Sequence, residues 1–402
     1  MVMIESGIRG GIAAISHRHA KANNEYMGTE FDPTKDSKFI SYFDVNNLHG
    51  WAMLKQLPTS GFKWMTDDEL HDWKHLSCIL EVDLDYPKDL HNLHNDYPLA
   101  PKRVKIGIVK KLIPNLNNKT NYVVHYENLK LYESLVLQIT KIHRRIKFEE
   151  SAWLEEYINL NMKLRIEAKQ SGNNFEVDFF KLMNNSVFGK TLESITKRVD
   201  IRVISSDKVV QKLATKPNYD CCTIFDQNLI AVHTKRTTLY FNKPVYLGMS
   251  ILDLSISLIY DFHYNYIKTK YKDKAQLLFT DTDSLAYEIK IKDFSKDINP
   301  DIEKLFDTSD YPINHPSPIK TGLNSKVLGM FKDEAGEKQI VEFVGLRAKL
   351  YSYKMLDGSV DKKCKGVTKN VTKRSIQSDD ILMTFFSGSP PVVGLAIFAS
   401  IT

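Results

Sequence analysis

The sequence predicts an α+β fold, in which a helical hairpin and a long buried helix lie between strands. Aromatic and β-branched residues at 39–45 predict a strand that ends near a carboxylate. Two helical segments, 153–170 and 175–193, follow each other along the chain, and a long apolar helix is predicted at 244–271. Two short strands, separated by Asp281-Thr282-Asp283, come directly after it. The order of strand, helical hairpin, buried helix and β-hairpin is typical of α+β proteins.

The first third of the chain contains two predicted strands. Residues before Ser37 are polar and rich in turn formers, so the first strand begins after them. A second strand is predicted at 78–84 from its apolar and β-branched residues. The stretch 85–121 carries many prolines, asparagines and histidines, and it predicts an inserted, loop-rich region.

Residues 126–145 are predicted to form an amphipathic helix. Leu131, Leu135, Ile139 and Ile142 recur at helical spacing, which would place them on one face.

Glycine and proline mark the ends of the later helices. Gly172, followed by two asparagines, stops the first helix of the hairpin. Pro244 suits the first position of the apolar helix, because its missing N–H needs no partner there. The strands after this helix are predicted at 277–280 and 285–289.

Length and composition set limits on the class of protein. A chain of 402 residues is too long for one ordinary core, so two or three subdomains are expected. A hydrophobic share of 43% and an aromatic share of 11% exclude a disordered chain. The net charge of +6 permits a polyanionic partner but does not require one.

The cysteines and the chain ends give no sign of secretion. Cys78, Cys221, Cys222 and Cys364 form no CxxC pair, and we expect reduced thiols. Residues 1–11 lack the features of a secretion signal. Residues 381–402 carry no charge and are long enough for a membrane span, but glycines and prolines break the segment in its middle. A truncated or aberrant chain end fits this composition better, and no membrane partner is expected.

Three aspartates suggest a metal site. In an extended turn Asp281 and Asp283 would share one face, opposite Thr282. Two adjacent carboxylates repel each other, and a divalent cation such as Mg²⁺ relieves the repulsion. Asp44 ends the earlier strand and would complete the set that two-metal phosphoryl transfer requires. The alternative is an ordinary turn, because Asp is common in turns for backbone reasons.

A helical face carries a further set of candidate residues. Lys181, Asn185, Phe188 and Gly189 follow one another at i, i+4, i+7 and i+8. The lysine offers a charge to a phosphate, the aromatic ring a surface to a base or sugar, and the glycine room for close approach. On the opposing helix Arg165 and Lys169 repeat the i, i+4 spacing, so three cations would face one cleft. The alternative for each cation is a solvated surface position.

Four segments resemble, in order, the motifs of family B DNA polymerases of the protein-primed viral, plasmid and transposon branch. Segment 44–53 resembles motif A, and 181–189 resembles motif B in the form KxxxNSx(Y/F)G. Asp281-Thr-Asp-Ser284 resembles motif C, and Lys349-Leu-Tyr351 resembles the KxY motif. Residues 7–11 are also similar to the Gly-Gly turn that joins exonuclease and polymerase regions in this branch.

The resemblance implies a role for each matched residue. Asp44 and Asp283 would bridge two Mg²⁺ ions, for which Mn²⁺ is an alternative, with Asp281 assisting and the Val45 carbonyl as a backbone ligand. Residues implied at the incoming dNTP are Arg165, Lys169, Lys181, Asn185, Phe188, Leu48 and His49. Residues implied at the primer-template DNA are Arg9, Gly10, Gly11, Lys349 and Tyr351, with the lysine run Lys362, Lys363, Lys365, Lys369 and Lys373.

The resemblance also implies a division into subdomains. In chain order these are an N-terminal segment that joins a missing exonuclease domain (1–36), the first part of the palm (37–145) with a loop-rich insertion (85–121), helical-hairpin fingers (146–193), the second part of the palm (194–345), and the start of the thumb with a truncated or aberrant tail (346–402). The palm is expected to contain an antiparallel sheet.

The sequence departs from the family in two ways. His49 stands where relatives carry a tyrosine that excludes a 2′-hydroxyl, so we expect weaker rejection of ribonucleotides. Acidic exonuclease motifs are absent, which implies a fragment without proofreading.

The function that the resemblance implies is template-directed DNA polymerisation. Two alternatives are a decayed relic that binds nucleic acid without polymerising, and a metal-dependent nuclease. A terminal protein primer, and a nuclear or mitochondrial compartment, are left open.

Overall fold

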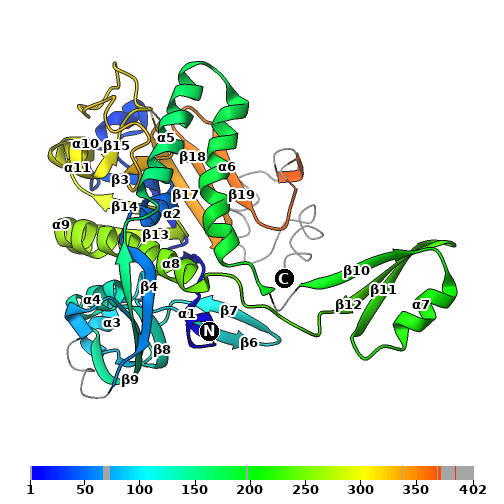
Figure 1. The fold of residues 1–402 in the computed structure, drawn as a ribbon. Coiled ribbons are helices and arrows are strands. Elements are labelled where there is room, and N and C mark those ends of the chain that lie inside the picture. The colour runs from blue at the N-terminus through cyan, green and yellow to red at the C-terminus, as the bar shows by residue number, and fades with distance from the viewer. Residues whose placement is uncertain are drawn as a thin grey trace.

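A six-stranded sheet lies at the centre of the computed structural model, with strand order β1-β13-β14-β3-β16-β15 (Figure 1). All neighbouring strands are antiparallel except β15 and β16. Their bounds are β1 (Ala13–Ile15), β13 (Ala275–Asp281), β14 (Ser284–Lys290), β3 (Lys38–Val45), β16 (Phe331–Asp333) and β15 (Phe306–Asp307). The structure describes residues 2–66, 73–195, 198–336, 338–368, 370–372 and 385. The strands predicted at 39–45, 277–280 and 285–289 are confirmed.

Strand β3 is buried on both faces, which its run of apolar and aromatic residues allows. Phe39 and Phe43 belong to the core on the helical side of the sheet. Ile40 and Tyr42 alternate with them and belong to a second core, shared with β17 and β18. The sheet therefore lies between a helical layer and a second sheet.

Helix α8 (Val245–Asp261) supplies most of the helical layer and is confirmed close to its predicted bounds. It continues through a π-helical turn, η5 (Phe262–Lys268), into α9 (Thr269–Tyr271). Pro244 is its N-cap residue rather than its first helical residue. Segment Val245–Lys274 is long and apolar enough to cross a membrane, but 72% of its most apolar window is buried inside the protein, as in a core helix.

Two further four-stranded sheets flank the centre. The sheet behind the second core contains β19 (Val360–Cys364), β18 (Leu350–Met355), β17 (Ile340–Arg347) and β2 (His19–Lys21), in that order. The other contains β4 (Leu57–Trp64), β9 (Gln138–Ser151), β5 (Cys78–Asp85) and β8 (Lys119–His125). Strand β5 confirms the strand predicted at 78–84.

The helix predicted at 126–145 is wrong in its second half. Helix α4 (Tyr126–Ser134) ends early, the backbone turns at Val136 with φ +71°, and β9 follows. Ile139 and Ile142 pair with β5 residues only two apart, Leu84 and Val82, because a β-bulge adds one residue to β9. Because of the bulge, Ile139 and Ile142 lie on the same face of the strand although they are three residues apart. The same spacing is typical of a helix, which is why a helix was predicted.

The inserted region is also more regular than predicted. It begins with η3 (Lys88–Leu90) and α3 (His91–His94). Strands β6 (Lys102–Ile106) and β7 (Val109–Ile113) then form a hairpin, so the loop prediction is wrong for these residues.

Helices α5 (Glu155–Gln170) and α6 (Asn174–Thr191) pack side by side and confirm the predicted hairpin (Figure 1). Gly172 has φ +73°, a conformation that favours glycine, and it reverses the chain between them. The Asn173 side chain then caps α6 by accepting a hydrogen bond from the Glu176 N–H.

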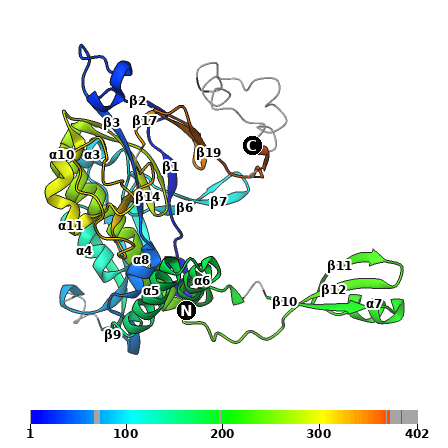
Figure 2. The ribbon, with the colours of Figure 1, turned by 90° about the horizontal axis from the view of Figure 1, so that it is seen from above.

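Residues after this hairpin form an arm that the sequence did not reveal. It contains the sheet β10 (Val199–Ile204), β12 (Leu229–Lys235) and β11 (Tyr219–Asp226), covered by α7 (Asp207–Ala214). Both views show the arm projecting away from the other sheets (Figures 1 and 2). The short helices are α1 (Val2–Gly7), η1 (Glu25–Glu30), α2 (Leu48–Met53), η6 (Lys272–Lys274), α10 (Phe294–Ile298), η7 (Asn299–Asp301) and α11 (Ile302–Leu305).

Some sequence predictions fall outside the described residues. These are the C-terminal tail at 381–402, of which only Phe385 is described, and the lysines Lys369 and Lys373.

Candidate active site

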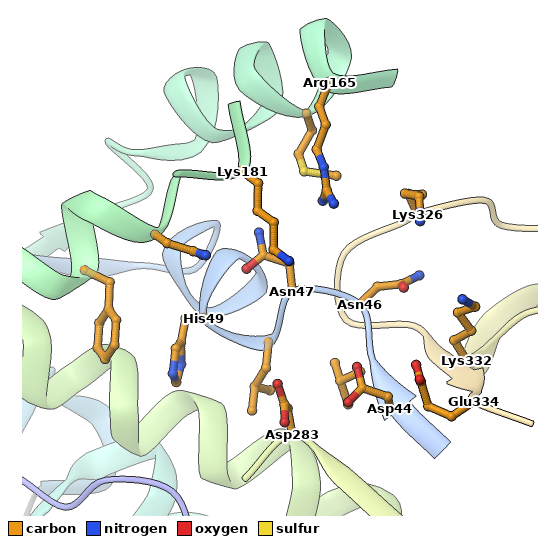
Figure 3. A pocket seen from close by; sticks show the side chains of 15 residues that line it. Asp44, Asn46, Asn47, His49, Arg165, Lys181, Asp283, Lys326, Lys332 and Glu334 are labelled. Carbon is orange, nitrogen blue, oxygen red and sulfur yellow. The ribbon is translucent and has the colours of Figure 1, made fainter. Parts of the chain in front are cut away.

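A cavity of about 470 Å³ opens between the α5–α6 hairpin and the end of β3 (Figure 3). Carboxylates lie on one side of it with Lys332 beside them, and Arg165, Lys181 and Lys326 lie on the other side. It is lined by Asp44, Val45, Asn46, Asn47, Leu48, His49, Met162, Arg165, Lys181, Asn185, Phe188, Asp283, Lys326, Lys332 and Glu334. The cavity therefore joins residues from motif-like segments that are far apart in the sequence.

The register of the central sheet brings Asp44 and Asp283 together. Asp44 pairs with Ser284 across β3 and β14, and the Val45 N–H donates to the Asp283 carbonyl over 2.9 Å. Glu334 follows β16, and its N–H donates to the Tyr42 carbonyl. Burial, then the nearby Asp283 and Glu334, raise the pKa of Asp44 to about 8. Burial likewise raises the pKa of Asp283.

Asp281 does not share this face, which corrects the expectation from the extended turn. Thr282 has φ +68°, and this left-handed residue breaks the alternation of side chains. Asp281 is only 4% exposed and accepts ion pairs from Lys349 at 2.7 Å and Lys363 at 2.8 Å. Despite burial, these two lysines hold its pKa below the usual range. Asp281 is thus neutralised by the protein itself.

The donors present fit a hard divalent cation only in part. Asp44 and Asp283 offer carboxylate oxygens whose repulsion a cation would relieve. Among the described residues, however, no group of three or more His, Cys, Asp or Glu side chains is arranged to hold a metal ion. Asp281 would join such a group only after release from its lysines. The Val45 carbonyl as a ligand stays a prediction.

The cationic side of the cavity is larger than the sequence predicted. Arg165 on α5 and Lys181 on α6 line it as expected. Lys169 instead lines an adjoining cavity of about 250 Å³, together with Arg165 and Lys326. Lys326 and Lys332 were missed, because they lie in or next to the irregular β15–β16 connection and no periodic pattern marks them.

Lys326 is held over the cavity by a buried carboxylate. Its backbone is left-handed, with φ +59°, and its N–H donates to Asp307 Oδ2 over 2.8 Å. The same oxygen accepts from the Asn46 side chain over 2.6 Å, and Asp307 is only 2% exposed. Burial, then Lys169 and Lys332, lower the pKa of Lys326. Asp307 therefore fixes a strained, charged residue beside the end of β3.

The aromatic residues predicted for nucleotide binding are in mutual contact. The rings of His49 and Phe188 lie 4.2 Å apart between centroids, and His49 Nδ1 lies 3.0 Å from the Ser255 hydroxyl. Burial lowers the pKa of His49, which favours its neutral form. Leu48 is buried and lines the cavity, and Asn185 is exposed at the cavity wall.

The side chains of Arg9 and Tyr351 lie in the interior of the protein. A side chain that contacts DNA must be exposed, so these positions do not match the predicted role in DNA binding. Arg9 is 8% exposed, pairs with Asp253 at 3.7 Å, and lies 3.7 Å above the ring of Tyr122. Tyr351 is 3% exposed and stacks on Phe279 with centroids 4.3 Å apart. Both side chains are therefore packed in the interior, and neither lines the cavity.

Gly10 and Gly11 are exposed, and Gly11 touches the acidic turn. A Cβ atom added at Gly11 would lie 2.2 Å from Thr282 Cγ2, whereas nothing lies within 4 Å at Gly10. The Thr282 N–H also donates to the Ile12 carbonyl over 2.7 Å. Glycine at position 11 is therefore required by the close approach of the turn.

We expect Gly11→Ala to destabilise the protein by about 1–3 kcal/mol, because the methyl group displaces Thr282. The double variant Gly11→Ala/Thr282→Gly removes the clash, and glycine tolerates the positive φ, so its stability should recover. Urea unfolding measures both variants, with Gly10→Ala as the control. Equal stability of Gly11→Ala and Gly10→Ala would contradict this account.

Asp44 should make the stability of the metal-free protein depend on pH. Its pKa is raised to about 8 by folding, so its stabilising contribution is complete below about pH 4 and is lost as pH rises toward 8. Other groups with shifted pKa values, among them His94, His125 and Lys119, also affect stability in the range pH 6.5 to 8, so Asp44 is measured by the difference between the native chain and Asp44→Asn.

From pH 6.5 to pH 8 in EDTA, we expect the native chain to lose about 1–2 kcal/mol of unfolding free energy relative to Asp44→Asn. Mg²⁺ at pH 8 should raise the unfolding midpoint of the native chain but not of the variant. Identical pH profiles of the two proteins would show that Asp44 is not responsible.

Comparisons with known proteins agree with this architecture. Residues 19–267 match the family described as DNA polymerase type B, organellar and viral. Phi29 DNA polymerase in a ternary complex with primer-template DNA and incoming nucleotides is similar in structure, with TM-score 0.57 and 15% identity. Its binary complex with primer-template DNA gives TM-score 0.54 and 14% identity.

Both matches cover 94% of this chain and 57% of the Phi29 chain, so this chain spans little more than half the length of that polymerase. At this level of identity the likeness concerns the fold alone. Among the curated proteins, no sequence matches the chain.

Proposed function

We propose, since this chain belongs to the organellar and viral type B DNA polymerases, that it extends a DNA primer on a template with deoxynucleoside triphosphates. The observation that carries the proposal is the cavity in which Asp44 and Asp283 face Arg165, Lys181 and Lys326. A nucleoside triphosphate matches this separation of charge, because its β- and γ-phosphates can lie against the cations while its α-phosphorus reacts beside the carboxylates.

The subdomains are proposed on the same basis. The six-stranded sheet that carries the aspartates is the palm, helices α5 and α6 are the fingers, and β17–β19 begin the thumb. The arm of β10–β12 and α7 is a separate appendage between the fingers and the second part of the palm. This assignment changes the predicted palm ranges 37–145 and 194–345 in three places, because the arm is set apart, β1 joins the palm sheet, and β17, which begins at Ile340, joins the thumb.

In the proposed reaction the primer 3′-oxygen attacks the α-phosphorus of the dNTP and forms a new oxygen–phosphorus bond. The bond between the α-phosphorus and the oxygen that bridges to the β-phosphate breaks, pyrophosphate leaves, and the proton of the 3′-hydroxyl passes to water. Mg²⁺ or Mn²⁺ held by Asp44 and Asp283 would supply charge neutralisation and an acidified 3′-hydroxyl. Arg165, Lys181 and Lys326 would hold the triphosphate, and His49 and Phe188 would flank the sugar and base.

The test is primer extension with Mg²⁺ by the native chain, alongside binding of the same primer-template. Extension supports the proposal. Binding without extension supports the second candidate function, an inactive nucleic-acid-binding relic. The ion pairs that hold Asp281 against Lys349 and Lys363 favour this second candidate, because they occupy a carboxylate that the reaction is expected to use. A terminal protein as primer stays a proposal.

His49 is expected to weaken the rejection of ribonucleotides. Its ring is smaller than a tyrosine ring, and its contacts with Phe188 and Ser255 hold it at the cavity wall. We expect His49→Tyr to raise the preference for dNTP over rNTP by about tenfold, equivalent to about 1.4 kcal/mol. The ratio of kcat/KM for the two substrates measures it. Equal discrimination by the native chain and His49→Tyr would exclude this role.

A further inference from the structure

The β6–β7 hairpin stands apart from every other sheet. Its two strands pair only with each other, and its base is anchored where Leu112 packs on the main core. The rest is open to solvent, up to Ile108 at the tip, which is 96% exposed. A two-stranded hairpin without further packing is marginally stable in water.

The hairpin is basic throughout. Residues 102–113 contain no aspartate or glutamate, and Arg103, Lys105, Lys110 and Lys111 are all exposed. Within the part of the chain that the structure describes, none of these four forms an ion pair, whereas Lys102 is held by Thr120. Arg103, Lys105 and Lys110 share one face of the hairpin by their register.

One cross-strand pair works against folding. Lys105 lies directly opposite Lys110, and like charges in that position destabilise a β-ladder. Lysines on exposed strands can protect a sheet edge from aggregation. Edge protection does not require two lysines to face each other, nor the absence of any acidic residue. A polyanionic partner explains both features, because it would neutralise the whole face.

We propose that the β6–β7 hairpin is a DNA-binding element that contacts the phosphodiester backbone outside the cavity. The proposal rests on the proposed function in one respect, namely that DNA is the partner. Alternate residues of a strand lie about 6.8 Å apart. Successive phosphates of one DNA strand rise by about 3.4 Å, so this spacing corresponds to two phosphate steps. The hairpin extends to the same side of the molecule as β19, which carries Lys362 and Lys363 (Figures 1 and 2).

An anionic membrane is the rival partner, because the exposed Ile106, Ile108 and Val109 form an apolar tip between cations. The cations continue down both strands to Arg103 and Lys111, away from the tip, which suits an elongated backbone better than a shallow insertion. Vesicles containing phosphatidylserine and phosphatidylcholine provide the discriminating probe.

The experiment compares the full-length native chain with Arg103→Gln/Lys105→Gln/Lys110→Gln/Lys111→Gln. The matched control, Lys272→Gln/Lys274→Gln/Lys290→Gln/Lys304→Gln, removes four exposed lysines near α9–α11, on the opposite side of the molecule (Figure 1). Each variant loses four positive charges, so its net charge is +2 instead of +6. Binding to labelled duplex and single-stranded DNA is measured in EDTA without nucleotide, at several salt concentrations, so catalysis plays no part.

The hairpin variant should bind DNA about 100-fold more weakly at low salt, and the slope of log K against log salt should fall by about 3. The control should change neither quantity appreciably. Equal binding by the hairpin variant and the control overturns the proposal while leaving the proposed function intact. If the native chain binds no DNA, both fall. Vesicle binding that depends on the hairpin, with unchanged DNA binding, also overturns it.

A single substitution separates stability from binding. Lys110→Glu replaces a like-charge pair by an attractive pair with Lys105, so it should not lower the unfolding midpoint. It should nevertheless weaken DNA binding by about tenfold. Unchanged DNA affinity in a folded Lys110→Glu variant would show that the lysines serve only to protect the strand edges.

Discussion

Asp283→Ala is expected to slow primer extension by a factor of about 1,000 or more while leaving primer-template binding within about twofold of the native chain. Asp283 lines the cavity next to Asp44, and no lysine forms an ion pair with it among the described residues. Its removal therefore takes away one of the two aspartates that are proposed to hold the metal ions. Single-turnover extension measures the effect, with the exposed Asp273→Ala as control.

Asp281→Asn should behave differently from Asp283→Ala. Asp281 is committed to Lys349 and Lys363, so its loss removes two ion pairs and lowers the unfolding midpoint as well as activity. Asp283→Ala should leave the midpoint unchanged or raise it, because it removes a carboxylate whose pKa burial has raised. If Asp283→Ala extended primers at the native rate, the proposed active site would be wrong.

Lys181→Ala is expected to lower kcat/KM for the dNTP by about 100-fold, since a cation facing the triphosphate is lost from the cavity wall. Lys326→Ala should cost about tenfold, mainly through KM, because Lys326 lies across the cavity from the α6 residues (Figure 3). Steady-state extension at varied dNTP concentration measures both.

Lys190→Ala is the matched control, because Lys190 lies on the same helix but outside the cavity and pairs with Glu193. An unchanged KM for both Lys181→Ala and Lys326→Ala, with Lys190→Ala also unchanged, would place the triphosphate elsewhere.

Local sequence patterns predicted those features of the site that depend only on residues close together in the chain. Asp44 at the end of a strand, Asp283 in a β-turn and Lys181 on a helical face were each marked by their own segment, and the cavity brings these three together. The second half of the helix predicted at 126–145 failed for a related reason. A β-bulge in β9 produced the spacing of a helix, and only the pairing with β5 distinguishes the two.

Contacts between distant segments were beyond the reach of those patterns. The ion pairs of Asp281 involve Lys349 and Lys363, which the sequence assigned to DNA contacts. The backbone of Lys326 is positioned by a hydrogen bond to Asp307, which also accepts one from Asn46, and no local sequence pattern predicts these contacts. Arg9 was assigned to template DNA from its motif, but its pairing with Asp253 depends on how α8 crosses the sheet.

The pairing of β1 with β13 determines when the acidic turn can be assembled while the chain is being synthesised. Ala13 is the register partner of Asp281, and Asp281 also requires Lys363. Contacts between residues so far apart in the chain form slowly, because a large loop must close first. A ribosome will have made Asp44 and the α5–α6 hairpin long before it makes Lys363. The acidic turn therefore reaches its folded environment only late in translation, and nascent chains that stop earlier will contain the individual motifs without the assembled site.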